Sequence, residues 1–277
     1  MSVATVSAPV RIGVIGVGEM GRPLVDRLLA AGHPVAALVR RAELRAELAA
    51  AGVEVVDAID ALAKGRDIVI VFVFTDEQVR AIALDDGLVD AMEPGSLLVV
   101  HTTGSPQTVE TIAAHANARG IAVVDAPVSG GPGKIATGTI TLLVGGEAAA
   151  VVRCRPVFAC YANPVLHVGA LGMGHRLKLI NNLMFGAHIQ LAIEAARVGR
   201  TFGIDAGELA RTLGHCSGNS AALALVALMG SPAGLMAAAG RFVHKDVLVA
   251  SQLAEELGAD LGLLGTVTAP LRKARET

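Results

Sequence analysis

A glycine-rich turn near the start of the chain constrains the fold more than any other feature. Residues 13–21 read GVIGVGEMG and join an apolar, strand-like stretch at 10–15 to a helical stretch at 23–31. Gly16, Gly18 and Gly21 have the spacing G-x-G-x-x-G. The first glycine of such a turn permits a sharp bend, the second lets the backbone approach a pyrophosphate, and the third lets helix and strand pack closely. The run therefore predicts a dinucleotide-binding unit.

The context of this turn matters more than its spacing. Because 32 of the 277 residues are glycine, roughly 0.4 chance occurrences of the spacing are expected. The position between a strand and a helix makes the match more specific. The alternative interpretation is a glycine-rich turn in another kind of α/β protein.

Strand-like and helix-like segments alternate through residues 1–168. This alternation predicts an α/β Rossmann domain with a doubly wound, mostly parallel sheet that binds ligands at the carboxyl ends of its strands. From residue 169 to 277 we predict a long connecting helix, over about 174–203, and an all-helical C-terminal domain. The expected later strands are 35–39, 53–56, 67–74, 97–100, 121–124, 139–144 and 165–168.

Composition excludes several partners. Lys and Arg total 23 and Asp and Glu total 25, so no basic surface is expected for nucleic acid or an anionic membrane. The apolar stretch 221–239 is broken by Gly230, Ser231 and Pro232, which leaves each half too short to span a bilayer. Apolar residues make up 53% of the chain, so we expect an apolar surface. An apolar surface usually faces another subunit, which favours a homo-oligomer.

The cysteines and the N-terminal region bear on location. The three cysteines form an odd number without metal-like spacing, which is typical of thiols in a reducing compartment. The N-terminal residues show no basic segment leading into an apolar run, so no secretion signal is expected. We therefore predict a cytoplasmic protein that uses no metal.

Two arginines follow the second predicted strand. A coenzyme with a free ribose 2′-hydroxyl would need an acid there, whereas Arg40 and Arg41 suit a 2′-phosphate. We therefore predict NADP, with NAD as the alternative coenzyme. The competing interpretation is that the arginines are solvated and that Glu43 holds the ribose.

The loop DAPVSGGPG, residues 125–133, follows a strand and so lies at the ligand edge of the sheet. Ser129, Gly130 and Gly131 can present a hydroxyl and successive N–H groups to a small anion. An ordinary Pro/Gly loop is the alternative.

The predicted long helix begins with GMGHRLKLINN, residues 172–182. Gly174, Lys178 and Asn182 are four residues apart and share one helix face. A glycine there lets a ligand or another backbone come close. A lysine can stabilise and protonate a carbonyl oxygen that gains negative charge, and an asparagine can orient it. A solvated helical lysine is the alternative.

A fourth segment reads RFVHKDVLVA, residues 241–250. We expect Lys245 to lie at a helix start and to reach the coenzyme, with Asp246 capping that helix. A plain capping aspartate beside an exposed lysine is the alternative.

In this order the segments resemble the β-hydroxyacid dehydrogenase family, which includes 3-hydroxyisobutyrate dehydrogenase and tartronate semialdehyde reductase. The resemblance covers residues 12 to about 250. It implies a Rossmann domain followed by a helical domain, in dimers or tetramers, with Lys178 as the acid/base. The matching runs are GVGEMG, DAPVSGG with GTITLLVGG, GMGHRLKLINN and HKDVLVA. The expected coenzyme-binding residues are Gly16, Val17, Gly18, Glu19, Met20, Gly21, Arg40, Arg41, Phe74, Thr75, Thr102, Thr103 and Lys245.

One segment departs from the family pattern. HTTGSP, residues 101–106, stands where the family has an Asp, then Ser-Thr, then an apolar residue. Thr102 and Thr103 keep hydroxyls near the expected nicotinamide, whereas His101 and Gly104 differ and leave the shape of the pocket unpredicted.

These observations predict an NADP-preferring oxidoreductase for a small β-hydroxyacid and its semialdehyde. Ser129, Gly130 and Gly131 would hold the substrate carboxylate, Lys178 would protonate the nascent alkoxide, and Asn182 would orient it. The alternatives are an imine reductase, which typically has another proton donor in place of the lysine, and a non-catalytic dinucleotide-binding protein. The exact substrate, the physiological direction and the oligomer number are not predicted.

Overall fold

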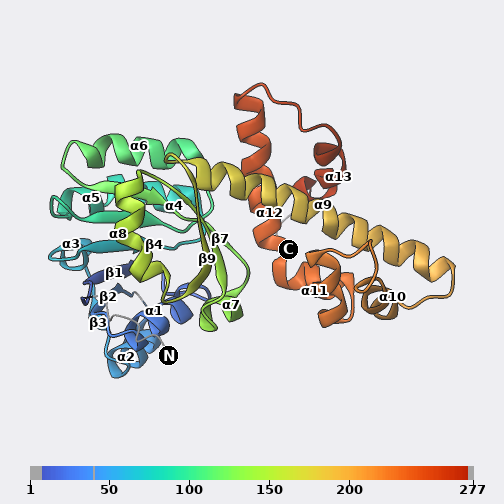
Figure 1. Ribbon diagram of the computed structural model, residues 1–277, viewed down its shortest axis with the longest axis horizontal. Helices are drawn as coiled ribbons and strands as arrows, with labels where there is room; N and C mark the ends of the chain where they lie inside the picture. The colour runs from blue at the N-terminus through green and yellow to red at the C-terminus, as the bar shows by residue number, and fades with distance from the viewer. Residues whose placement is uncertain (1–7, 40, 274–277) are drawn as a thin grey trace. The chain divides into compact units, whose positions relative to one another are not determined.

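The computed structural model describes residues 8–39 and 41–273. The chain divides into two compact units, residues 1–178 and 179–277 (Figure 1). The sequence places the division at 168/169, where the last strand ends, whereas the compact units part further along, inside a long helix.

The first unit is built on one mostly parallel sheet, as the alternation predicts. Its strand order is β3-β2-β1-β4-β5-β6-β8-β7, with β9 also paired to β8. Strands β1 to β6 pair in parallel, β8 runs antiparallel to β6 and β7, and β9 is parallel to β8. The strands are β1 (Ile12–Ile15), β2 (Val35–Leu38), β3 (Glu54–Val56), β4 (Ile68–Val71), β5 (Leu97–Val100), β6 (Ala122–Asp125), β7 (Val128–Ser129), β8 (Ile140–Gly145) and β9 (Ala162–Gly169).

Helices cover both faces of this sheet and bury two separate hydrophobic cores (Figure 1). One core packs α1, α2, α7 and α8 against the sheet, and the other packs α3, α4, η1, α5 and α6. Because β1 and β4 are central and fully buried, their carboxyl ends form a rigid edge for a site. The helices are α1 (Gly21–Ala30), α2 (Ala42–Ala50), α3 (Ile59–Ala63), α4 (Asp76–Arg80), the π-helical η1 (Ala81–Asp85), α5 (Leu88–Ala91), α6 (Pro106–Asn117), α7 (Pro132–Ala136) and α8 (Ala148–Phe158).

The remaining elements are helices, as expected from the sequence. They are α9 (Met173–Thr201), α10 (Ala206–Leu213), α11 (Ala221–Met229), α12 (Pro232–Glu256) and α13 (Gly262–Lys273). The core of the second unit contains Leu183, Ile189, Val226, Val243 and Val247. Within residues 8–39 and 41–273, every helix is too short or too polar to cross a bilayer.

The break expected inside 221–239 is confirmed, because Gly230 ends α11 in a left-handed conformation and Ser231 caps α12. The expectation that a helix starts at Lys245 is wrong. Lys245 and Asp246 lie deep inside α12, since the Ala-rich residues after Pro232 form helix continuously through Gly240.

The apolar run 67–74 is also shorter as a strand than predicted, because pairing ends at Val71. Phe72 and Val73 continue the chain into the turn before α4, and Val73 lines a groove at this edge of the sheet.

Candidate functional site

The glycine turn between β1 and α1 has the three properties that its spacing predicts. Gly16 has φ +100°, and a Cβ on it would overlap the carbonyl oxygen of Phe72. A Cβ on Gly21 would overlap the carbonyl oxygen of Gly16, whereas nothing lies within 4 Å of the Cβ position at Gly18. The outer glycines therefore serve close packing, and the middle one leaves space for a ligand beside the backbone.

The N-terminus of α1 is suited to an anion. Met20 occupies the N-cap without a side-chain cap, and the first turn contains no acidic residue. The first N–H groups of a helix and its dipole attract phosphate when no side chain occupies them.

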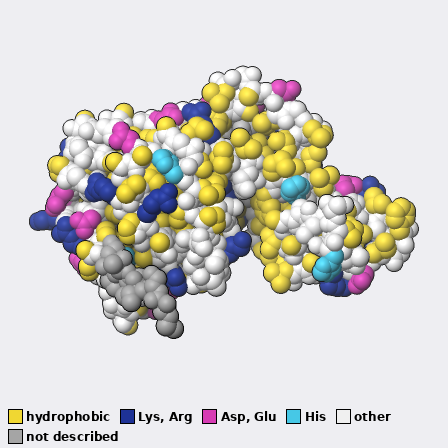
Figure 2. All heavy atoms as spheres, in the orientation of Figure 1, with side chains coloured by type: hydrophobic (Ala, Val, Ile, Leu, Met, Phe, Trp, Pro, Cys, Tyr) yellow, Lys and Arg dark blue, Asp and Glu magenta, His cyan; other side chains and the backbone are white. Residues whose placement is uncertain are grey.

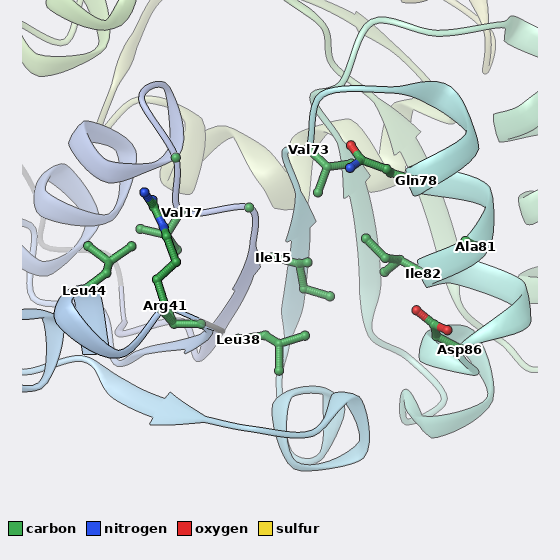
Figure 3. Close-up of a pocket in the computed structure, with 13 residues that line it drawn as sticks. Ile15, Val17, Leu38, Arg41, Leu44, Val73, Gln78, Ala81, Ile82 and Asp86 are labelled. Atoms are coloured by element: carbon green, nitrogen blue, oxygen red, sulfur yellow. The ribbon is translucent and has the colours of Figure 1, made fainter. Parts of the chain in front are cut away.

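A groove of about 380 Å³ opens beside this turn (Figure 3). Figure 3 shows Val17, Arg41 and Leu44 on one side and Val73, Gln78, Ile82 and Asp86 on the other. Two apolar walls with a few polar groups at the ends suit a flat ring attached to a charged chain. The lining residues are Ile15, Gly16, Val17, Gly18, Leu38, Val39, Arg41, Leu44, Val73, Gln78, Ala81, Ile82 and Asp86.

The arginines expected at the ribose are placed only in part. Arg41 is the N-cap residue of α2 and lines the groove, whereas Arg40 lies outside the described residues. Glu43 lies in the first turn of α2, is exposed, and is not among the residues that line the groove. The groove thus contains a guanidinium and no carboxylate at its β2 end among the residues that the structure describes.

The turn after β4 is held by its own side chains. Thr75 caps α4, and the Gln78 side-chain oxygen accepts hydrogen bonds from the backbone N–H groups of Phe74 and Thr75, each at 3.0 Å. This reciprocal arrangement fixes the path of the chain at the edge of the groove.

The hydroxyl of Thr102 forms hydrogen bonds within the protein. Thr102 is 3% exposed, and its Oγ1 donates to the Val73 carbonyl and accepts from the Val73 N–H, both at 2.9 Å. Thr102 therefore ties the loop after β5 to the turn after β4, and Thr103 continues that loop.

His101 explains one departure of this loop. It is 1% exposed, its Nδ1 lies 2.6 Å from the Ala126 carbonyl oxygen, and its Nε2 lies 2.9 Å from the Tyr161 hydroxyl. Because the carbonyl can only accept, Nδ1–H donates and Nε2 accepts from the phenol. Burial lowers the pKa of His101 to about 4. The neutral ring packs against Phe72, Phe158 and Tyr161, which makes it a structural brace.

Gly104 explains the other departure. A Cβ on Gly104 would overlap the carboxylate of Asp76, which accepts hydrogen bonds from the Ser105 N–H at 3.1 Å and the Thr108 hydroxyl at 2.5 Å. Desolvation raises the pKa of Asp76. An acid from the α4 turn thus fills the space that an apolar side chain would take.

Ser129, Gly130 and Gly131 connect β7 to α7. Gly130 has φ +130°, and a Cβ there would lie 2.8 Å from Ile140 Cδ1 and from Lys134 Cδ. Gly131 is the N-cap residue of α7, and nothing lies within 4 Å of its Cβ position. The open space at Gly131 leaves its backbone accessible to a small ligand.

Asp125 anchors the start of α9 within the first unit. It is fully buried, and its two oxygens accept from the N–H groups of Gly172 and His175, each at 2.8 Å. A Cβ on Gly174 would overlap the Leu143 carbonyl oxygen, and one on Gly145 would overlap the Asp125 carboxylate. Of the two possibilities for Gly174, the structure therefore supports close approach of another backbone.

The expected catalytic residues both lie on α9 and are both buried, Lys178 at 8% exposed and Asn182 at 7%. Their burial disagrees with a solvated helical lysine. In the second unit, Asn182 Nδ2 donates to Asp246, and Asn181 Nδ2 donates to the Asn182 side-chain oxygen at 2.8 Å. Lys245 Nζ lies 2.8 Å from the other oxygen of Asp246. Asp246 is thus a partner of Asn182, not a helix cap.

Sequence reasoning missed Asp125, His175 and Asp246 as members of these networks. A buried strand that ends in Asp125 is a usable signal, because a carboxylate at that edge needs donors. The partners of His175 and Asp246 are distant in the sequence, and nothing in the local pattern indicates them.

Two sequence profiles match adjoining parts of the chain. The profile of the NAD binding domain of 6-phosphogluconate dehydrogenase matches residues 11–169. The profile described as NAD-binding of NADP-dependent 3-hydroxyisobutyrate dehydrogenase matches residues 172–277.

Several curated relatives carry dehydrogenase names, and others are named only as oxidoreductases. An NAD-dependent L-serine dehydrogenase of Pseudomonas aeruginosa is 34% identical over 77% of this chain and 72% of its own length. A 3-hydroxyisobutyrate dehydrogenase of the same organism is 33% identical over 77% and 72%.

Solved structures extend the likeness to nearly the whole chain. A Mycobacterium tuberculosis 3-hydroxyisobutyrate dehydrogenase, solved with L-serine, has a TM-score of 0.84 at 27% identity, covering 96% of this chain and 93% of that one. A Streptomyces aurantiacus imine reductase has a TM-score of 0.68 at 17% identity over 95% and 93%, which shows a shared fold alone.

Proposed function

This chain belongs to the family of NAD(P)-dependent β-hydroxyacid dehydrogenases, and on that premise we propose that it interconverts a small β-hydroxyacid and its semialdehyde with Lys178 as the acid/base. The observation that carries the assignment to Lys178 is an 8% exposed lysine one helical turn from a buried asparagine. Buried ionisable side chains are concentrated at functional sites, where burial tunes their proton affinity.

The first unit fits a nicotinamide dinucleotide. Gly18 leaves space beside the backbone, the N-terminus of α1 has no side-chain cap, and the groove can take the adenosine half between its apolar walls. When bound, the coenzyme supplies or accepts the hydride. We propose NADP over NAD because Arg41 lines the groove at the β2 end, where a 2′-phosphate gains most from a guanidinium.

In the proposed mechanism, residues of this chain stabilise charge on the substrate, transfer a proton and hold the substrate in place. During reduction the Lys178 ammonium stabilises the growing negative charge on the substrate oxygen and gives it a proton, and during oxidation the lysine takes the hydroxyl proton. Asn182, held by Asp246, is pre-oriented to position the same oxygen. The loop of Ser129, Gly130 and Gly131 would hold the substrate carboxylate through its hydroxyl and backbone N–H groups.

We further propose a homo-oligomer, a dimer or a tetramer, in the cytoplasm. Within the second unit, apolar side chains on α9 lie exposed at intervals of four and seven residues, which places them on one helix face. They are Ile180, Met184, Leu191 and Val198, exposed by 56, 43, 56 and 39%. Figure 2 shows hydrophobic side chains gathered over the helices of this unit. A second copy of the chain would cover such a stripe.

The test of the catalytic proposal is Lys178→Ala in an assay with a panel of small semialdehydes and hydroxyacids and both coenzymes. We expect turnover to be abolished and coenzyme affinity to be kept. The matched control is Lys64→Ala, which removes an exposed lysine beyond α3 and should leave turnover unchanged. Unchanged turnover in the Lys178 variant would contradict the mechanism.

The same panel, extended with cyclic imines, separates the alternatives. An imine reductase would consume cyclic imines and leave semialdehydes untouched. A non-catalytic protein would bind coenzyme and oxidise or reduce nothing in the panel.

A further inference from the structure

His175 connects the start of α9 to two neighbouring segments of the first unit. The ring is 1% exposed, and its Nε2 lies 2.8 Å from the backbone carbonyl oxygen of Thr102. The backbone N–H of the same residue donates to Asp125 at 2.8 Å. His175 therefore holds the first turn of α9 to the loop after β5 through its side chain and to the end of β6 through its backbone.

The proton on this ring follows from its partners. A carbonyl oxygen can only accept, so Nε2 carries a proton and donates it to Thr102. The other nitrogen, Nδ1, has no hydrogen-bond partner among the described residues and lies 3.7 Å from Asp125 Oδ2. The contact that fixes the orientation of the ring is thus the Nε2–H donor.

The loop that receives this hydrogen bond is itself immobilised. The Thr102 hydroxyl is hydrogen-bonded to both backbone groups of Val73, in the turn after β4. The chain of contacts thus runs from the turn after β4 through Thr102 to α9. The side chains of Thr102 and His175 are both buried, so breaking either side chain's hydrogen bonds would leave a buried polar atom unpaired. This cost favours a single arrangement of the loop and the helix.

His175 precedes Lys178 by three residues on α9, so their Cα atoms are about one turn apart, with a rise of about 4.5 Å, on one side of the helix. We propose that His175 is a positioning residue, whose Nε2–H bond to the Thr102 carbonyl sets the helical turn that bears Lys178 against the loop after β5. This inference rests on the proposed role of Lys178 and adds a residue to which that role gave no part.

The test replaces the ring by two side chains of similar length and volume that differ in one group. In His175→Gln the amide nitrogen takes the place of Nε2 and can donate to Thr102, whereas His175→Met fills the space without a donor. Arg176→Ala is the control, since Arg176 is the next residue and makes an exposed ion pair with Glu110 at 3.1 Å.

For each variant we would measure kcat, KM, coenzyme Kd and the primary isotope effect with deuterated coenzyme. We expect His175→Gln and Arg176→Ala to stay within about threefold of the wild-type kcat. We expect His175→Met to lose about 10- to 100-fold in kcat with an unchanged coenzyme Kd, because small displacements of a reacting group have effects of this size. If His175 served only to stabilise the fold, both variants would melt at a lower temperature than the wild type, and glutamine would not restore kcat.

Equal kcat values in the Gln and Met variants, high or low, would overturn the proposal, and so would a loss confined to coenzyme Kd. Should the Met variant not fold, His175→Asn replaces it, because its shorter amide reaches only the Nδ1 position. Lys178→Ala, run in the same assay, separates the two levels. If it keeps turnover, the proposed function fails. If it loses turnover while His175→Met stays active, the inference about His175 alone fails.

Discussion

The buried imidazole of His101 predicts a pH dependence of folding that can be calculated. Burial lowers its pKa to about 4, from the ordinary histidine value of 6.5 that applies to the unfolded chain. Between these pH values the unfolded chain binds a proton that the folded chain does not, so the free energy of unfolding falls as the pH falls. The two pKa values differ by roughly 2.5 units, at about 1.36 kcal/mol per unit. The free energy of unfolding is therefore lower by about 3 kcal/mol at pH 4 and almost unchanged above pH 7.

The variant that isolates this effect is His101→Asn. Its amide nitrogen takes the place of Nδ1 and still donates to the Ala126 carbonyl, but the side chain does not titrate. We expect the variant to be less stable than the wild type at pH 7, because the Tyr161 hydroxyl loses its acceptor. That difference should shrink by about 3 kcal/mol between pH 7 and pH 4.

The assay is urea unfolding followed by circular dichroism at half-unit pH steps, for the wild type, His101→Asn and the exposed control His215→Asn. Shifts at His33, Asp67 and Asp76 also act in or near this pH range, but they are common to all three proteins and cancel in the differences. A stability difference that stays constant with pH would refute the reasoning, as would a nuclear magnetic resonance titration in which the His101 ring protonates near pH 6.5.

Two further predictions concern coenzyme binding. Gly16→Ala should abolish coenzyme binding and destabilise the first unit, since the φ of +100° and the contact with the Phe72 carbonyl oxygen leave no room for a Cβ. Gly18→Ala has open space at its Cβ, so it should fold normally and weaken coenzyme binding alone. Calorimetry and thermal melts on both variants check this contrast. Arg41→Ala should raise the Kd for NADP about tenfold, the lower end for a charge-assisted bond because Arg41 is exposed, and leave the Kd for NAD unchanged; equal effects on the two coenzymes would show that Arg41 does not read the 2′-phosphate.

Local sequence signals predicted the features that neighbouring residues determine. The strand-turn-helix at Gly16 to Gly21 was predictable because its constraints, a positive φ and a close backbone contact, act over a few residues. The alternation of strands and helices likewise predicted the parallel sheet and the helical second unit. The helix face shared by Lys178 and Asn182 followed from periodicity alone.

Features that depend on distant partners were not predictable. The sequence predicts that Thr102 lies near the nicotinamide, but it does not indicate that the Thr102 hydroxyl bonds both backbone groups of Val73, which is 29 residues earlier. The sequence predicts Asp246 as the cap of a helix that starts at Lys245, whereas Asp246 lies inside α12 and accepts from Asn182, which is 64 residues away. No local pattern distinguishes these cases, since the deciding term is the desolvation of each polar group in the folded chain.

The brace around His101 also gives the protein a natural optical reporter. Tyr161 is the one tyrosine of a chain that has no tryptophan, and it is fully buried with its hydroxyl donated to His101. Burial raises the pKa of this phenol well above its usual value, so the ring stays un-ionised in alkaline buffers. Its ultraviolet absorbance and emission therefore come from a single known position beside the loop of Thr102. A change in that signal on adding a ligand will read out this corner of the first unit without any introduced label.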